Sequence, residues 1–229
     1  MIPAMLFCIL RRYLSDKKVD RNFIAETFTQ LKTSIKPVLI AILFIAASAS
    51  VCANEQTLNY SVLHNGKVVG SMQLYQKRSG ENLYLRIHSD VKMRLIVGIH
   101  VQLEEESFYK YGKLINSRLC RKVNGDEKAN RQTIASGNNY KTIAEGRSGI
   151  MSTPNIDTNL IMLYVNEPGL TTKVYSDNFQ KFLNIRKVKT HCYRIDLPDG
   201  NYNDYTYTNG ICSKIDIHHT LYTIQVQLT

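Results

Sequence analysis

The side chains best suited to acid–base chemistry are three consecutive glutamates at positions 104–106. They follow Val101 and Leu103, whose spacing predicts a strand with one apolar face. If that alternation continues, Glu105 points into the core while its two neighbours face water.

A buried carboxylate is costly unless it has a partner. We therefore expect Glu105 to contact Arg86, Arg118 or a ligand. The alternative is a strand edge or bulge that lets all three glutamates reach solvent, and Phe108 does break the alternation.

Tyrosines are concentrated near the end of the chain, at positions 193, 202, 205 and 207. Such residues line the mouths of ligand sites, but they also pack well across a sheet, and packing is the favoured interpretation. The candidate ligand-binding residues are therefore Glu105, Arg86, Tyr205 and Tyr207.

Cysteines give a weaker indication of chemistry. His191-Cys192, or His218-His219 with Cys120, would supply the residue types of a Cys–His nucleophile pair, but nothing in their spacing requires one. The sequence has no CxxC, zinc-finger, HExxH or GxSxG motif and no glycine-rich phosphate loop. We expect no metal, no cofactor and no enzymatic activity.

Strand alternation places both Cys192 and Cys212 on a polar face. In a simple meander, a strand over residues 202–208 separates theirs. Two strand spacings are about 9.6 Å, beyond the roughly 7 Å limit for a disulfide, so we predict that these cysteines are not bridged.

Charge is positive and dispersed. The 229 residues carry a formal charge of +10, and the 22 basic and 16 acidic residues after position 53 leave that part at +6. Because the basic residues are scattered, we expect no nucleic-acid binding. An ordinary solvated surface is the favoured interpretation, and peripheral contact with an anionic membrane is the alternative.

An uncharged apolar tract at 37–53 follows Lys32 and Lys36 and has Val51 and Ala53 at the −3 and −1 places of a cleavage site. These features predict a secretory signal peptide, a periplasmic location and a mature chain from about Asn54. At 17 residues the tract is shorter than the roughly 20 of a membrane span. A retained anchor through 37–53 is the alternative.

A start near Leu31 would leave residues 31–53 as a compact signal peptide. On that hypothesis residues 1–30 are a dispensable leader or are not translated. The alternative is a genuine extended leader.

Residues 54–229 read as one β domain, because apolar and polar residues alternate through most of it. Asn65-Gly66 and Asn209-Gly210 are strong hairpin signals. The one change of period, after the capping signal Ser152-Thr153-Pro154, predicts a short helix over 154–165. We expect an all-β fold, a strongly curved antiparallel sheet or a barrel-like (lipocalin-like or half-barrel) structure.

Three blocks carry a family resemblance: NGKVVG at 65–70, DVKM at 90–93 with Gly98-Ile99, and EESFYKYGKL at 105–114. They resemble a family of exported bacterial proteins known only as a domain of unknown function. The resemblance implies an all-β, barrel-like envelope protein, and it carries no catalytic residues. The absence of tryptophan departs from the family pattern.

These observations predict a periplasmic envelope β-protein that binds an apolar small molecule or lipid. The reason is an apolar face longer than a small sheet needs, combined with a cationic exterior. The alternative is an assembly or interaction factor with a filled core and no ligand. An enzyme is a minor alternative.

Overall fold

The computed structural model describes residues 53–94 and 97–229. The predicted leader, and all of the predicted signal peptide except Ala53, lie outside these residues and remain predictions. The described chain forms one sheet of 14 strands, and every neighbouring pair is antiparallel. The strands are β1 (Asn54–His64), β2 (Lys67–Ser79), β3 (Asn82–Arg94), β4 (Gly98–Lys110), β5 (Lys113–Val123), β6 (Asp126–Ser136), β7 (Asn139–Ala144), β8 (Arg147–Met151), β9 (Lys173–Ser176), β10 (Lys181–Lys189), β11 (Cys192–Asp196), β12 (Tyr202–Thr208), β13 (Ile211–His219) and β14 (Tyr222–Leu228).

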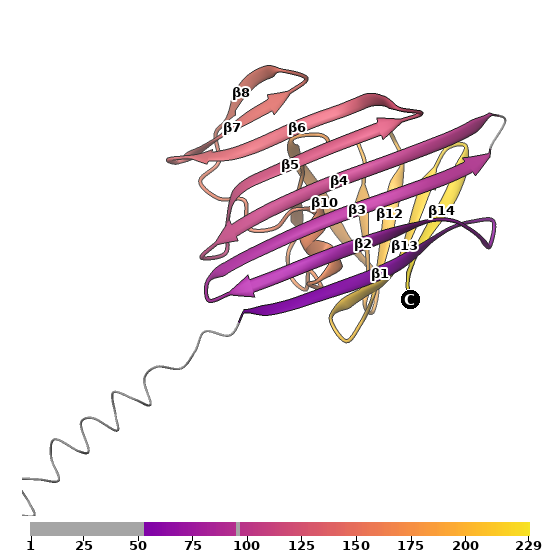
Figure 1. The fold of residues 1–229 in the computed structure, drawn as a ribbon. Helices are drawn as coiled ribbons and strands as arrows, with labels where there is room; N and C mark the ends of the chain where they lie inside the picture. Colours follow the sequence, from indigo (N-terminus) through magenta and orange to yellow (C-terminus); the bar gives the residue numbers. More distant parts are fainter. Residues whose placement is uncertain (1–52, 95–96) are drawn as a thin grey trace, which may run out of the picture. The chain divides into compact units, whose positions relative to one another are not determined.

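The sheet is a meander whose first and last strands meet in its middle. β1 pairs with both β2 and β14, and the two edges are β8 and β9. In Figure 1 the long strands from β1 to β6 cross in front of the strands from β10 to β14, so the curved sheet faces itself. The prediction of an all-β, strongly curved antiparallel sheet is confirmed, and the sheet remains open between β8 and β9.

Both predicted Asn-Gly hairpins are present. Asn65 and Gly66 have φ of 50° and 74°, and Asn209 and Gly210 have φ of 51° and 79°. These left-handed conformations suit asparagine and glycine, and their twist matches that of the flanking strands. Local sequence therefore sets these two reversals.

Gly70 satisfies a different requirement. A Cβ built there would lie 2.3 Å from the carbonyl oxygen of Asp90 and 2.7 Å from the Cα of Val91. Only glycine lets β2 and β3 approach this closely.

The short helix that the described part of the chain contains is a 3-10 helix, η1 (Leu160–Tyr164), and it falls inside the predicted range. The predicted helical start at Pro154 is wrong, because distant groups bind the backbone of residues 156–159. The Ile156 carbonyl accepts from the Leu114 N–H at 2.9 Å, and the Thr158 carbonyl accepts from the Tyr175 N–H at 2.9 Å. Those bonds hold the chain extended up to η1.

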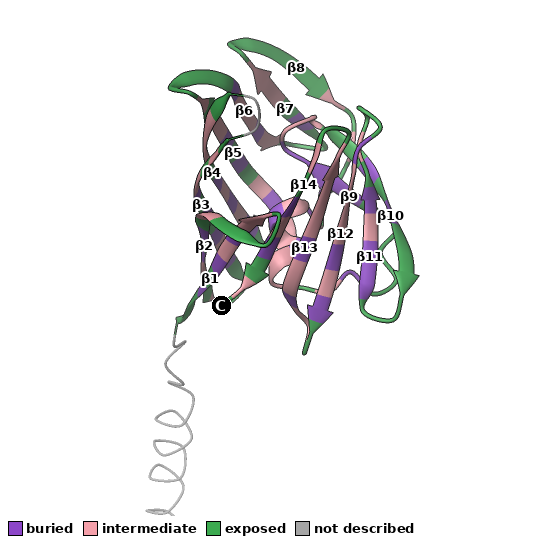
Figure 2. Ribbon diagram, turned by 90° about the vertical axis from the view of Figure 1, so that its right-hand side faces the viewer, coloured by how far each residue is buried: buried purple, intermediate pink, exposed green. Residues whose placement is uncertain are grey.

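The core fills the space between the two halves of the sheet. Figure 2 shows buried residues on the strands of both halves, with η1 between them. Contacts of η1 extend to β3, β4, β9 and β13. The largest fully buried side chains are Tyr60, Tyr109, Tyr140, Tyr175, Leu74, Leu85, Ile87, Leu114, Ile156, Ile161, Leu163 and Ile195.

Side chains connect the β9–β10 turn with β6 and β7, which are not paired with it through backbone ladders. Gln180, in the turn between β9 and β10, donates from Nε2 to the carbonyls of Gln132 and Ile143 at 3.0 Å each. Arg131 Nε of β6 donates to the Asn178 carbonyl at 3.3 Å. The β9–β10 turn is thereby fixed against β6 and β7.

Candidate functional site

Glu105 lies on the inner face of β4, as strand alternation predicted. Its Cα pairs with those of Ile87 and Leu119 on the neighbouring strands, and Glu105 is 7% exposed. Residues paired directly across a sheet share a face. Glu105 therefore sits among apolar side chains.

The partner of Glu105 is a second carboxylate, Asp177, in the turn after β9. Asp177 is 2% exposed. Ser117 of β5 donates from Oγ to Asp177 Oδ1, and Asn159 donates from Nδ2 to Asp177 Oδ2 at 2.7 Å. Asp177 thus receives hydrogen bonds from two elements far apart in sequence.

Burial raises the pKa of both carboxyl groups. The pKa of Glu105 is raised well above its usual value, first by desolvation and then by the charge of Asp177 and the hydrogen bond to it. Desolvation raises the pKa of Asp177 to about 6, although the bonds from Ser117 and Asn159 oppose that rise. Two buried carboxyl groups in contact disfavour the doubly charged state of the pair.

Asn159 extends this pair into a buried polar network. Its Oδ1 accepts from the Tyr109 hydroxyl at 2.7 Å, and its Nδ2 also donates to Ser107 Oγ at 2.8 Å. Tyr109 and Ser107 are inner-face residues of β4 and are 1% and 0% exposed. The network therefore fixes the chain on either side of η1 against β4 and β5.

Two buried acceptors in this interior have no hydrogen-bond partner among the described side chains and backbone. They are Glu105 Oε1 and Asn203 Oδ1. Asn203 lies on β12 two residues before Tyr205. Burial raises the pKa of Tyr205, and the nearby Cys212 and Glu105 add to that rise. Both orphan atoms can accept a hydrogen bond from a bound donor.

The structure brings only some of the predicted site residues together. Tyr205 is 3% exposed and packs edge-to-face with Tyr164 at a ring separation of 6.3 Å. The Tyr207 hydroxyl instead donates to the Leu163 carbonyl at 2.8 Å. Tyr205 therefore shares the interior with Glu105, whereas the polar group of Tyr207 is satisfied by the chain that carries η1.

Arg86 and Arg118 lie on the outer face, so the expected contact with Glu105 does not form. Both pair across the ladder with Glu106. Arg86 Nε is 3.3 Å from Glu106 Oε1, and the two side chains are 49% and 42% exposed. Each arginine is adjacent in sequence to an inner-face residue. Consecutive side chains of a strand point to opposite faces, so both arginines point outward.

The prediction for the cysteines is corrected at one position. A register shift near Ser213 turns Cys212 inward, where it pairs with Tyr207 and is 0% exposed. Cys192 instead pairs with Thr206, on the outer side of the same sheet, and β12 separates the two cysteine strands. Both thiols are free.

The described residues contain no group of three His, Cys, Asp or Glu side chains placed to hold a metal ion. Of the helices in residues 53–94 and 97–229, none has the length and apolar character needed to cross a bilayer.

The inner face also carries an apolar row whose burial changes along the sheet. The row runs in register through Ile215, Val226, Val62, Gly70, Val91, Val101 and Val123. Ile215, Val226 and Val62 are 1%, 4% and 3% exposed. The last three members, which we call the half-buried valines, are only partly covered.

Sequence reasoning missed Asp177, Asn159, Ser107 and Ser117. The two serines gave the one available signal, since each occupies an inner-face position of a strand and a polar residue there needs a partner. The identity of that partner depends on a turn far along the chain, which local patterns do not reveal.

Comparison with known protein families identifies one family, whose model matches most of the chain. The model of a domain of unknown function, DUF6134, matches residues 60–229. The chain belongs to the DUF6134 family. The expectation of a family known only as a domain of unknown function is confirmed.

Among curated proteins, none matches this DUF6134 chain. It is similar to a solved structure, a beta-barrel-like protein of a domain of unknown function, DUF1849, from Brucella abortus. That match has a TM-score of 0.49 at 9% identity and covers 78% of this chain and 96% of that chain.

Proposed function

We propose that this DUF6134 protein is an exported, non-enzymatic envelope protein that binds an apolar chain, such as a lipid acyl chain, against the half-buried valines. The carrying observation is the burial gradient along the cross-strand row, from 1% at Ile215 to half-buried at Val123. Exposed apolar surface costs about 25 cal/mol per Å². A bound chain would remove that cost.

The neighbours of the half-buried valines support the same proposal. Met93 and Ile99, paired across β3 and β4, are also half-buried, and so is Leu103. On the other half of the sheet, Ile217 and Tyr222 are partly buried and pack against the core. The apolar surface is therefore broader than one row.

Export rests on the tract at 37–53. Its basic flank, apolar run and small-residue end are the parts of a signal peptide. A C-terminally tagged chain expressed from its own start should appear in the periplasmic fraction, shortened to begin near Asn54. Full-length protein in the cytosol would contradict export.

An assembly factor without a ligand is the second candidate, and the filled centre of the fold favours it. Leu85, Leu74 and Ile195 are each 0% exposed, so the middle of the sheet is fully packed. On this alternative, the half-buried valines contact another protein.

Native mass spectrometry of envelope-purified protein, with matched variants, separates the two. Val91→Glu places a charge on the inner face, and Lys92→Glu places it one residue away on the outer face, where Lys92 is exposed. We expect wild type and Lys92→Glu to carry a co-purifying amphiphile and Val91→Glu to lose it. Ligand-free wild type, or equal occupancy in both variants, would contradict the proposal.

A further inference from the structure

We propose that the ligand carries an anionic head, a carboxylate or phosphate monoester, and that Arg121 binds this head while the half-buried valines hold the chain. The inference rests on the proposed function and names the ligand class. Its basis is a basic side chain on the apolar inner face, in the cross-strand row next to that of the half-buried valines.

Arg121 belongs to the inner face of β5. Its Cα pairs with that of Leu103 on β4 and with that of Ala129 on β6. Ala129 is 1% exposed, Leu103 is half-buried, and Arg121 itself is half-buried. A guanidinium group here is partly removed from water and stands beside apolar side chains, where an opposite charge is worth more than at a fully exposed site.

Within residues 53–94 and 97–229, Arg121 has no acidic partner. The arginine ion pairs among the described residues use Arg86, Arg131, Arg186 and Arg194. Glu105, the inner-face carboxyl in the next cross-strand row, is hydrogen-bonded to Asp177. Arg131, the neighbouring inner-face arginine, is paired with Glu145. Among the described residues, Arg121 is the half-buried inner-face arginine without an acidic partner, since Arg78 and Arg147, which lie on the same face by register, are exposed.

The placement of Arg121 also sets the direction of the chain. Val123, Val101 and Val91 lie in register on β5, β4 and β3, and Gly70 continues the row on β2. Three strand spacings cover about 14 Å. A head at Arg121 would let a single alkyl chain run across the strands along this row. Guanidinium binds carboxylate or phosphate through two parallel hydrogen bonds.

The test compares dodecanoate, dodecyl phosphate, dodecanol and inorganic phosphate, each below micelle-forming concentration, by calorimetry on the chain from Asn54 onward. Wild type is compared with Arg121→Met and with Arg118→Met, which removes an exposed outer-face arginine of the same strand. Thermal melting and near-UV circular dichroism verify that each variant is folded.

We expect wild type and Arg118→Met to bind the two anionic amphiphiles about tenfold tighter than dodecanol. Arg121→Met should bind all three alike, and inorganic phosphate should not bind measurably. An anion preference that survives in Arg121→Met, equal binding of dodecanoate and dodecanol by wild type, or binding of free phosphate as tight as dodecyl phosphate would overturn the inference. If no amphiphile binds wild type, the proposed function fails as well.

Discussion

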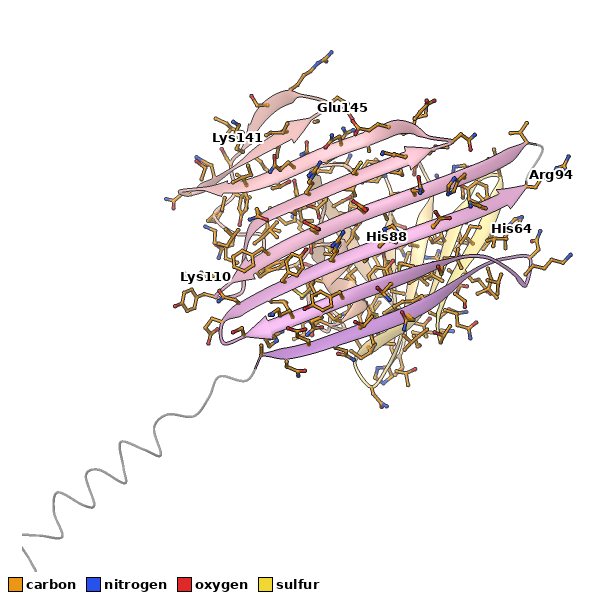
Figure 3. The ribbon with its side chains drawn as sticks, viewed as in Figure 1. His64, His88, Arg94, Lys110, Lys141 and Glu145 are labelled. Atoms are coloured by element: carbon orange, nitrogen blue, oxygen red, sulfur yellow. The ribbon has the colours of Figure 1, made fainter. Side chains whose placement is uncertain are left out.

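The inner faces of β3 and β4 have a covered end and a half-buried end, although both ends are apolar. Lys110 and Arg94 mark these two ends in Figure 3. Near Lys110, Leu85 and Tyr109 are 0% and 1% exposed, whereas near Arg94 the inner residue Met93 is half-buried. Alternation is the same at both ends, so cover from other elements decides burial.

The cover at the first end is the chain around η1. Its extended part bonds to Leu114, its Asn159 bonds to Tyr109, and η1 itself contacts β3 and β4. A strand pattern therefore predicts which residues face inward, but not whether anything lies against them. The half-buried end is where we propose that a ligand takes the place of that cover.

The largest test of this comparison is alanine substitution at each end. Leu85→Ala should lower the free energy of unfolding by about 3 kcal/mol, because it leaves a buried apolar cavity. Met93→Ala should cost about 1 kcal/mol, since a half-buried side chain loses less apolar contact on truncation. Urea unfolding measures both values, and equal losses would show that the two ends are equally covered.

The pH dependence of stability sharpens the description of the covered end. The pKa of Asp177 rises from 3.8 to about 6 on folding, so the native state binds more protons than the unfolded state between these values. The stability that this group contributes is present at low pH, falls as pH rises through about 4 to 6, and stays low above. A rise of about 2 units corresponds to about 3 kcal/mol at most.

Asp177→Asn removes that contribution together with the effect of Asp177 on the pKa of Glu105, while the surface carboxylates are common to both proteins. The unfolding free energy of the variant minus that of wild type should increase by up to about 3 kcal/mol between pH 3.5 and 7. A difference that does not change with pH would show that burial does not raise the pKa of Asp177.

Two nearby tyrosines test the polar network with a smaller effect. Tyr109→Phe removes the donor to Asn159 Oδ1 and leaves a buried acceptor unpaired, which should cost about 1–2 kcal/mol. Tyr111→Phe is the control, because Tyr111 is 73% exposed, and it should stay within about 0.5 kcal/mol of wild type. Similar losses of unfolding free energy in the two variants would show that the network does not stabilise the covered end.

The smallest effect is expected on the outer face. Arg86→Gln breaks only the exposed pair with Glu106, and such pairs contribute about 0–1 kcal/mol. Its melting temperature should match that of wild type within about 2 °C. A larger drop would indicate that Arg86 has a role that the outer-face pair does not explain.

Local pattern predicted much of this fold. Period-2 alternation identified the strands and placed Glu105 inside, and Asn-Gly pairs located two hairpins. The rest depended on distant partners. The stretch before η1 is extended because Leu114 and Tyr175 bind its backbone, and no local signal reports those bonds.

Two side-chain placements show the same limit. Cys212 faces inward because of a register shift against β12, which a one-strand pattern does not show. The partner of Glu105 is a carboxyl group from the β9–β10 turn, and only the curvature of the whole sheet brings that turn to β4.

The measurement that tests the central claim most directly is methyl NMR of methionine-labelled protein with a spin-labelled long-chain fatty acid. Met93 is half-buried beside the half-buried valines, Met72 is 5% exposed in the core, and Met151 ends the edge strand β8. The account predicts that the Met93 signal broadens at the lowest concentration of fatty acid, and that this broadening reaches a plateau when the site is filled. Broadening of Met151 alone, or no broadening at any methionine, would contradict it.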